Sequence, residues 1–131
     1  MTHSLEVFSG DELVFFSDGK WIYPLFELER FLVDHRGAPE ALLAVDKIVG
    51  KAAAMMLVHL GIGQIHAGMM SSLAAAFLRQ RQVPFSCDEL VDRILCRTEE
   101  LLADIDDLEQ AYRLLKRRAE GDADPTPRAA P

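Results

Sequence analysis

A predicted helix over residues 48–60 is apolar on nearly all of its sides, and it sets the strongest limit on the fold. Such a helix has no polar face to turn to water, so it belongs in the interior of a domain. Short apolar runs typical of buried strands lie on either side of it, at residues 42–45 (LLAV) and 64–67 (QIHA). The order strand, helix, strand predicts two parallel strands of one sheet, with the helix packed on that sheet.

The remaining elements extend this alternation in both directions. Asp18-Gly19 between LVFF at 13–16 and WIY at 21–23 predicts a β-hairpin, because glycine reaches the positive φ that a tight turn needs. Pro24 is well placed to open a helix that continues to residue 32. The pattern then predicts helices at residues 71–81, 88–95 (DELVDRIL) and 107–118, and a short strand at 83–86. We therefore expect an α/β fold with a mixed sheet and an N-terminal β-hairpin.

Length and composition favour one soluble domain. Half of the 131 residues are hydrophobic, which is enough for a single core. We expect a domain over residues 1–119 and a disordered tail over 120–131, where EGDADPTPRAAP is rich in proline and in small or polar residues. A net charge of −7 disfavours a nucleic-acid partner. Without a signal peptide or a long apolar run, the chain is expected to be cytoplasmic and off the membrane, with Cys87 and Cys96 as reduced thiols.

Glycine and polar residues gather where two predicted strands end. In sheets of this kind, ligands bind beyond the C-terminal ends of the strands, where the following helices begin. These ends carry the candidate ligand-binding residues, which are Asp46, Lys47, Gly50, Lys51, Ser71 and Ser72.

Three familiar chemistries do not fit this sequence. A phosphate-binding loop of the GxxxxGK[ST] type would need a glycine and a Ser or Thr where Val45 and Ala52 stand. A zinc deaminase needs a glutamate close to its His ligand and a PCxxC pair, but Gly68 follows His66-Ala67 and no PCxxC is present. No GxSxG motif marks a serine nucleophile. The prediction is a site without metal or cofactor.

Lys47 and Lys51 lie four residues apart, on one face of the predicted helix start. That end is unfavourable for cations, because a helix N-terminus already carries about half a positive charge. One explanation is structural: both lysines reach to solvent while Asp46 caps the helix. The alternative is a small anion, such as a carboxylate or phosphate, that Lys51 contacts, with Gly50 admitting close backbone approach and Asp46 orienting Lys47.

Four segments together resemble a small prokaryotic family of unknown function that is a divergent relative of the cytidine deaminases. These segments are DGKWIYPLFELERFL, DKIVGKAAAMML, LVDRIL and DIDDLEQAYRLL, and the resemblance covers residues 13–118. It implies a cytidine-deaminase-like, three-layer α/β/α domain in which the metal-binding positions have been lost. It also implies that the block from Asp46 to Lys51 lies on the helix that bears a metal ligand in true deaminases. Ser71 and Ser72 would lie where the second helix of that site starts.

The chain departs from that family after LVDRIL. Where the family has a segment with a Cys-Pro pair and a glutamate, this chain passes from Cys96 and Thr98 directly to Glu99. If the missing segment lines the pocket, this member binds differently or has lost activity.

Three functions remain open. The first is a deaminase-like domain without zinc that binds a small anionic metabolite or nucleotide at the helix start between Asp46 and Lys51. The second is a protein–protein interaction or regulatory module, and a homodimer is one form it can take. The third is a metal-independent enzyme in which a lysine, its pKa lowered by burial and a like-charged neighbour, is the base or nucleophile.

Overall fold

Five strands form one mixed sheet in the computed structural model, which describes residues 3–121 and 128–129. The strand order is β2-β1-β3-β4-β5; β1 is antiparallel to β2 and β3, and β3, β4 and β5 are parallel. The predicted parallel pairing on either side of the apolar helix is confirmed. The elements in chain order are β1 (Leu5–Ser9), β2 (Glu12–Ser17), α1 (Tyr23–Asp34), the 3-10 helix η1 (Pro39–Ala41), β3 (Leu42–Val49), α2 (Lys51–His59), β4 (Gln64–Ser71), α3 (Ser72–Gln80), β5 (Phe85–Val91), β6 (Ile94–Leu95), α4 (Arg97–Leu102), α5 (Leu108–Gly121) and β7 (Arg128–Ala129).

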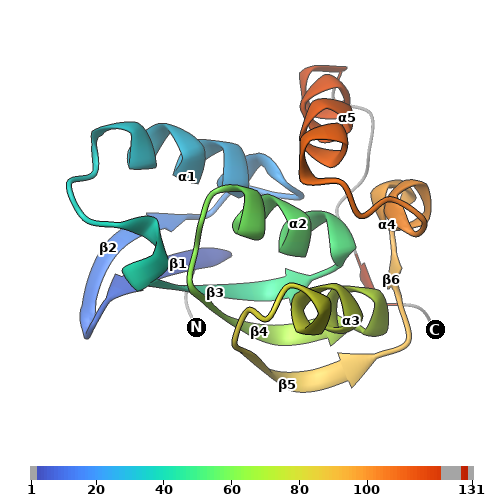
Figure 1. Cartoon of the computed structure of the whole chain (residues 1–131), viewed down its shortest axis with the longest axis horizontal. Helices are drawn as coiled ribbons and strands as arrows, with labels where there is room; N and C mark the ends of the chain where they lie inside the picture. Colours follow the sequence, from blue (N-terminus) through green and yellow to red (C-terminus); the bar gives the residue numbers. More distant parts are fainter. Residues whose placement is uncertain (1–2, 122–127, 130–131) are drawn as a thin grey trace.

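Helix α2 lies at the centre of the helical side of the molecule, which explains its apolar sequence. It packs on β3, between α1 and α3, and also contacts α4 and α5 (Figure 1). Its buried residues include Met55, Met56 and Leu57, which belong to the hydrophobic core. The prediction of an interior helix is confirmed.

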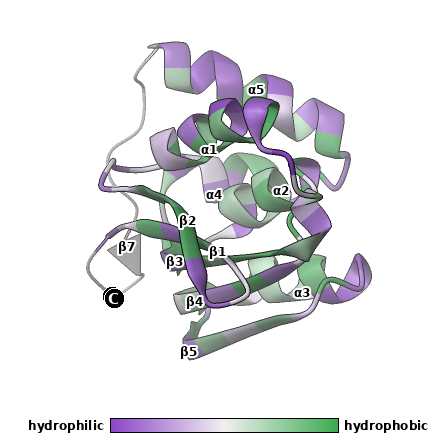
Figure 2. Ribbon diagram, turned by 90° about the vertical axis from the view of Figure 1, so that its left-hand side faces the viewer, coloured by the Kyte–Doolittle hydropathy of each residue, from purple (hydrophilic) through white to green (hydrophobic). Residues whose placement is uncertain are grey.

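The helices lie on one face of the sheet. The connections β3–α2–β4 and β4–α3–β5 step the same way across the sheet, and right-handed crossovers place both helices on the same side. α5 covers α1 and α2 on the side away from the sheet (Figures 1 and 2), where the Tyr112 ring stacks on His59 with 4.4 Å between centroids. The order of layers is therefore sheet, helices and one further helix. It differs from the α/β/α order that the resemblance implied.

The N-terminal hairpin forms from a different pair of strands than predicted. β1 pairs with β2, and the turn between them places Gly10 at φ +59°. Asp18 and Gly19, the predicted hairpin turn, instead connect β2 to α1. The prediction of a strand at residues 21–23 is wrong, because Trp21 adopts a left-handed conformation (φ +57°) and α1 begins at Tyr23.

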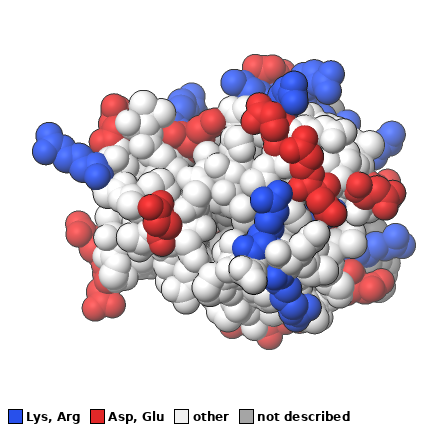
Figure 3. Space-filling view, viewed as in Figure 1, with Lys and Arg blue, Asp and Glu red and all other residues white. Residues whose placement is uncertain are grey.

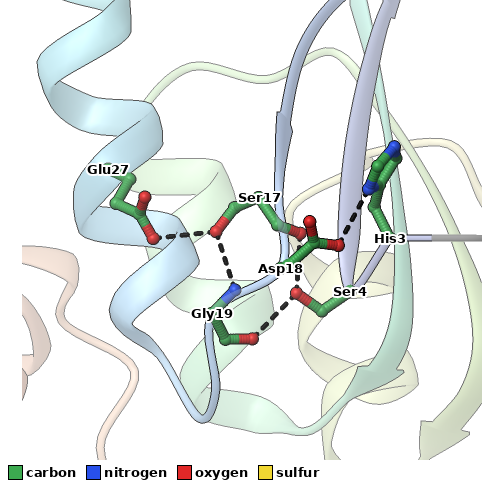
Figure 4. A network of polar contacts seen from close by, with 6 residues as sticks. All are labelled: His3, Ser4, Ser17, Asp18, Gly19 and Glu27. Atoms are coloured by element: carbon green, nitrogen blue, oxygen red, sulfur yellow. Dashed lines mark hydrogen bonds and ion pairs between the residues drawn. The ribbon is translucent and has the colours of Figure 1, made fainter.

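A polar network fixes the connection between β2 and α1 (Figure 4). The Ser17 hydroxyl donates to Oε1 of Glu27 on α1 at 2.8 Å and accepts from the backbone amide of Gly19 at 3.0 Å. The Ser4 hydroxyl lies 2.8 Å from the backbone carbonyl oxygens of both Ser17 and Gly19. The network holds the first turns of α1 beside the sheet and fixes the turn that carries Trp21.

Residues 88–95, predicted as a helix, are largely extended, so that prediction is wrong. β5 pairs in parallel with β4, and β6 pairs with β7. The edge of β4 offers backbone N–H and C=O groups for hydrogen bonds. The free energy gained by pairing with them exceeds the local preference for a helix that the spacing of apolar residues indicates. Of the predicted tail, Glu120 and Gly121 complete α5 and residues 128–129 form β7, while residues 122–127 and 130–131 lie outside the described part of the chain.

The second face of the sheet, named here the uncovered face, carries no helix within residues 3–121. Its side chains alternate with the buried ones along each strand. Phe16 and Leu13 are 52% and 41% exposed there, and Phe8, Leu43 and Val45 are half-buried.

Charged side chains of both signs are scattered over the side of the molecule seen in Figure 3, with uncharged areas between them. In the part of the chain that the structure describes, every helix is too short or too polar to cross a membrane.

Candidate functional site

The strand before the predicted site is longer than expected, and this moves the start of α2. β3 continues to residue 49, Gly50 is the extended N-cap residue (φ −91°, ψ −176°), and α2 begins at Lys51. Asp46 and Lys47 therefore lie inside the strand, where consecutive side chains point to opposite faces. Lys47 is exposed on the uncovered face, so the two lysines do not share a helix face.

Asp46 lies on the helical side of the sheet and does not cap α2. Its Oδ1 accepts a long hydrogen bond, 3.4 Å, from the backbone amide of Ile48. Burial raises the pKa of Asp46 to about 7, against the opposing effect of the backbone amides of Ile48 and Lys47. Ionisation of Asp46 therefore lowers the free energy of unfolding.

Glu99, a residue of α4, occupies the helix start where an anion was predicted. Its Oε1 accepts from the backbone amide of Lys51 at 3.1 Å and from the hydroxyl of Ser71 at 2.8 Å. The Ser71 hydroxyl in turn accepts from the backbone amide of Ala74 and caps α3. One carboxylate therefore joins the N-termini of α2 and α3, where negative charge is favoured.

The second carboxylate oxygen of Glu99 has no hydrogen-bond partner among the described residues, although Glu99 is only 2% exposed. This oxygen lies over Gly50 so closely that a Cβ atom at position 50 would collide with it. Burial raises the pKa of Glu99. The hydroxyl of Ser71 and the backbone amides of Lys51 and Ile94 lower that pKa again in part. The Ile94 amide acts as a nearby dipole, because it makes no hydrogen bond to Oε2. Gly50 thus allows close approach of a side chain of the protein itself, where the sequence predicted approach of an anionic ligand.

The Lys51 side chain bonds to other groups than Oε2 of Glu99. Its ammonium group donates to the backbone carbonyl of Ala103 at 3.0 Å and pairs with Oδ1 of Asp106 at 2.8 Å. Lys51 is 4% exposed, whereas Asp106 is 57% exposed. Through these two contacts, Lys51 links the start of α2 to the segment between α4 and α5.

A small cavity of about 30 Å³ opens beside Glu99 and Gly50, and we name it the Glu99 pocket. It is lined by Trp21, Ile22, Ile48, Gly50, Ala52, Ala53, Ile94, Cys96, Thr98 and Glu99. The indole Nε1 of Trp21 is buried and also lacks a hydrogen-bond partner, and it is the only such side-chain atom besides Oε2 of Glu99 in the described residues. Both polar atoms belong to residues that line the Glu99 pocket.

Other hollows are larger but lack this combination. One of about 250 Å³ shares Ile94 and Glu99 with the pocket, and two others of about 530 and 340 Å³ lie along α5. Trp21 lines none of these three. Within the described residues no three His, Cys, Asp or Glu side chains are arranged to hold a metal ion.

The structure brings together some of the predicted site residues and separates others. Gly50, Lys51 and Ser71 meet at Glu99. Ser72 is directed elsewhere, because its hydroxyl donates to the backbone carbonyl of Val91 at 3.2 Å.

Sequence reasoning missed Glu99, Trp21, Cys96 and Thr98. Thr98 is 1% exposed, and its hydroxyl lies 3.1 Å from the Cys96 thiol. The one signal was an acidic pair, Glu99-Glu100, before two leucines, and that pattern is equally typical of an exposed helix start.

Comparison with known proteins gives one consistent result. Residues 2–118 match the family model described as "TM1506: Domain of unknown function (DUF1893)". The crystal structure of a DUF1893 family protein (TM1506) from Thermotoga maritima is similar, with a TM-score of 0.77 and 31% sequence identity over 88% of this chain and 80% of that one. No curated protein matches the chain.

Proposed function

Because this chain belongs to the DUF1893 family of unknown function, we propose its function from the site itself: it binds a small polar molecule in the Glu99 pocket. The observation that carries the proposal is the buried, unpartnered Oε2 of Glu99 beside Gly50. Leaving a buried carboxylate oxygen without a donor costs free energy, about 1–3 kcal/mol, which a ligand that donates a hydrogen bond would recover. The proposal keeps the location predicted from the sequence, at the start of α2.

The chemistry of the ligand changes from that prediction. Glu99 already provides the negative charge at the N-terminus of α2, and the ammonium group of Lys51 is bonded to Ala103 and Asp106. An anion held by Lys51 would have to displace Asp106. If Lys51 binds an anion, Asp106→Asn should strengthen the binding of phosphate or carboxylates. If Glu99 is the recognition group, the same substitution should leave that binding unchanged.

A screen of small molecules by thermal unfolding tests the proposal. Ligands that bind the native state raise Tm by mass action. We expect at least one class among amides, amines, alcohols, carboxylates and phosphate to raise Tm for the wild type and for Lys47→Ala. Ala53→Met, which adds side-chain volume inside the pocket, should abolish that shift. An unchanged shift in a folded Ala53→Met variant would contradict the proposed location, and no shift with any class would contradict binding.

A relationship to the cytidine deaminases remains part of the proposal. It is supported by the resemblance of the DKIVGKAAAMML block and by the two central helices that start at Lys51 and Ser72, directly after parallel strands. The proposed domain has lost the metal site, so purified protein should contain no stoichiometric zinc by elemental analysis. Stoichiometric zinc would reject this version.

Self-association through the uncovered face is a second candidate function. Its centre is apolar, formed by Phe8, Leu13, Phe16, Leu43 and Val45. Glu6 and Lys47 lie on the same face with opposite charges, so a two-fold arrangement can pair them across two copies of this chain.

Sedimentation equilibrium tests this second candidate. We expect a dimer of the wild type that Phe16→Lys dissociates. Val33→Lys is the matched control, because Val33 is 78% exposed on α1, which packs on the opposite face of the sheet. A monomeric wild type, or equal dissociation by Val33→Lys, would contradict it.

A metal-independent enzyme with a lysine as base or nucleophile is the third function that the sequence left open. A carbonyl substrate would have to separate the ammonium group of Lys51 from Ala103 and Asp106 before reaction. Lys47 is free of this constraint but lies away from the Glu99 pocket, on the uncovered face. Borohydride trapping of a carbonyl compound on Lys51 would support this reading, and failure across aldehydes and ketones would count against it.

A further inference from the structure

The two unpartnered atoms of the Glu99 pocket differ in chemistry. The indole Nε1 of Trp21 is a donor only, whereas the carboxylate Oε2 of Glu99 is an acceptor. A group that satisfies both must accept one hydrogen bond and donate another. The side chains of Ile22, Ile48 and Ile94 are apolar, and the two further polar groups of the lining, the Cys96 thiol and the Thr98 hydroxyl, lie 3.1 Å from each other.

The volume of the pocket limits what can enter. About 30 Å³ corresponds to roughly two water-sized positions, at about 10–15 Å³ each. Two polar atoms joined through one carbon atom would fill it. The remainder of a larger ligand would have to stay outside.

Charge selects among the groups of that size. A carboxylate would bring a second negative charge next to Glu99 in an apolar environment, which is unfavourable. An ammonium group could donate to Glu99 but offers no acceptor to the indole N–H of Trp21. A carboxamide offers one carbonyl oxygen and an N–H group, and it carries no charge.

We infer that the Glu99 pocket recognises a neutral carboxamide, whose carbonyl accepts from Nε1 of Trp21 and whose N–H donates to Oε2 of Glu99. This inference rests on the proposed function, and it names the chemical class of the ligand. The apolar walls would then serve to exclude water and charged groups from the two hydrogen bonds.

Trp21 provides a direct probe, because it is the only tryptophan in the chain and its indole N–H gives one nuclear magnetic resonance signal. We would titrate the ¹⁵N-labelled protein with propionamide, propionate and propylamine at one pH and ionic strength. Propionamide should shift the indole signal saturably, and the other two should leave it in place. Glu99→Gln should weaken the propionamide affinity about tenfold, as expected for the loss of a hydrogen bond to a charged acceptor. Lys47→Ala should leave that affinity unchanged.

The possible results separate the inference from the proposed function. If propionate or propylamine shifts the indole signal and propionamide does not, the pocket binds small molecules and the carboxamide inference is wrong. If none of the three shifts it, the carboxamide inference is wrong; the proposed function fails only if the thermal-unfolding screen, which also includes alcohols and phosphate, gives no shift in Tm either. An equal affinity in a folded Glu99→Gln variant would overturn the role of Glu99.

Discussion

The backbone amide of Lys51 donates a hydrogen bond to Oε1 of Glu99, which lies 48 residues further along the chain. The same oxygen accepts from Ser71, the cap residue of α3, so one side chain holds the starts of both central helices. α4 has six residues, and this carboxylate links it to α2 and α3. The relationship makes Glu99 a structural residue as well as the proposed recognition group.

Gly50→Ala should destabilise the protein by about 1–3 kcal/mol, because the new Cβ would displace the carboxylate of Glu99. Gly121→Ala is the matched control; a Cβ there meets no atom of residues 3–121 within 4 Å, and the free energy of unfolding should hardly change. Urea unfolding measures both.

The double variant Gly50→Ala/Glu99→Ala should lose less stability than the sum of the single variants, because removal of the carboxylate makes room for the methyl group. Strict additivity would mean that Gly50→Ala acts through the backbone and that the collision with Glu99 is relieved at no cost.

Lys51→Ala should destabilise the protein by about 1–3 kcal/mol, because the carbonyl of Ala103 loses its donor and the buried lysine side chain leaves a void. Lys47→Ala, on an exposed position of the same sequence block, should stay within about 0.5 kcal/mol of the wild type. Equal effects of the two substitutions would show that the contacts of Lys51 carry no net stability.

Stability should fall as pH rises from about 4 to about 7. The pKa of Asp46 rises from 3.8 in the unfolded chain to about 7 in the native state, so the native state binds more protons than the unfolded state in that interval. The full shift would correspond to about 4 kcal/mol, an upper limit for a group that keeps some contact with solvent. The raised pKa of Glu99 acts in the same direction.

Denaturant unfolding at pH 5 and pH 8 checks this expectation. Asp46→Asn should reduce the difference in unfolding free energy between the two pH values, and the effect of Glu99 should remain. A difference that is unchanged in Asp46→Asn would show that Asp46 is not the titrating group.

Tyr112→Phe should cost about 1 kcal/mol, because the phenol hydroxyl donates to Oε2 of Glu29 at 2.8 Å and links α5 to α1. Burial, followed by the hydrogen bond to Glu29, raises the pKa of Tyr112 to about 12. Stability from this group is therefore present below pH 10 and is lost as pH rises through 12.

Ultraviolet titration resolves the same group, since the chain has only two tyrosines. The wild type should show a phenol that ionises at about 12, and Tyr112→Phe should lack it. A high-pKa phenol that persists in the variant would have to be assigned to Tyr23, which would contradict the prediction.

The centre of the fold could be predicted from the sequence, because there local pattern and tertiary environment agree. Apolar residues all around α2 indicated burial, and burial between the sheet, α1, α3 and α5 requires them. The edges were harder to predict. β5 carries a helical spacing of apolar residues, yet it forms a strand because it pairs in parallel with the edge of β4.

The candidate site shows the same division. The start of α2 directly after a strand follows from the order of elements, whereas binding of a ligand beside Gly50 stays a prediction. The partner that approaches, Glu99, could not be identified, because its role depends on how α4 folds back over two helices that are distant in the sequence. Single-sequence patterns carry no information on such long-range pairs.

The collision between a side chain at position 50 and the carboxylate of Glu99 constrains how the two positions can evolve. A lineage cannot acquire any larger residue at position 50 while the glutamate is present without losing stability. Substitution of the glutamate by a smaller residue releases the constraint on the glycine, but it also removes the hydrogen bonds to Lys51 and Ser71. The two positions are therefore epistatic, and relatives that lack the acid are the ones in which a residue other than glycine can be accepted.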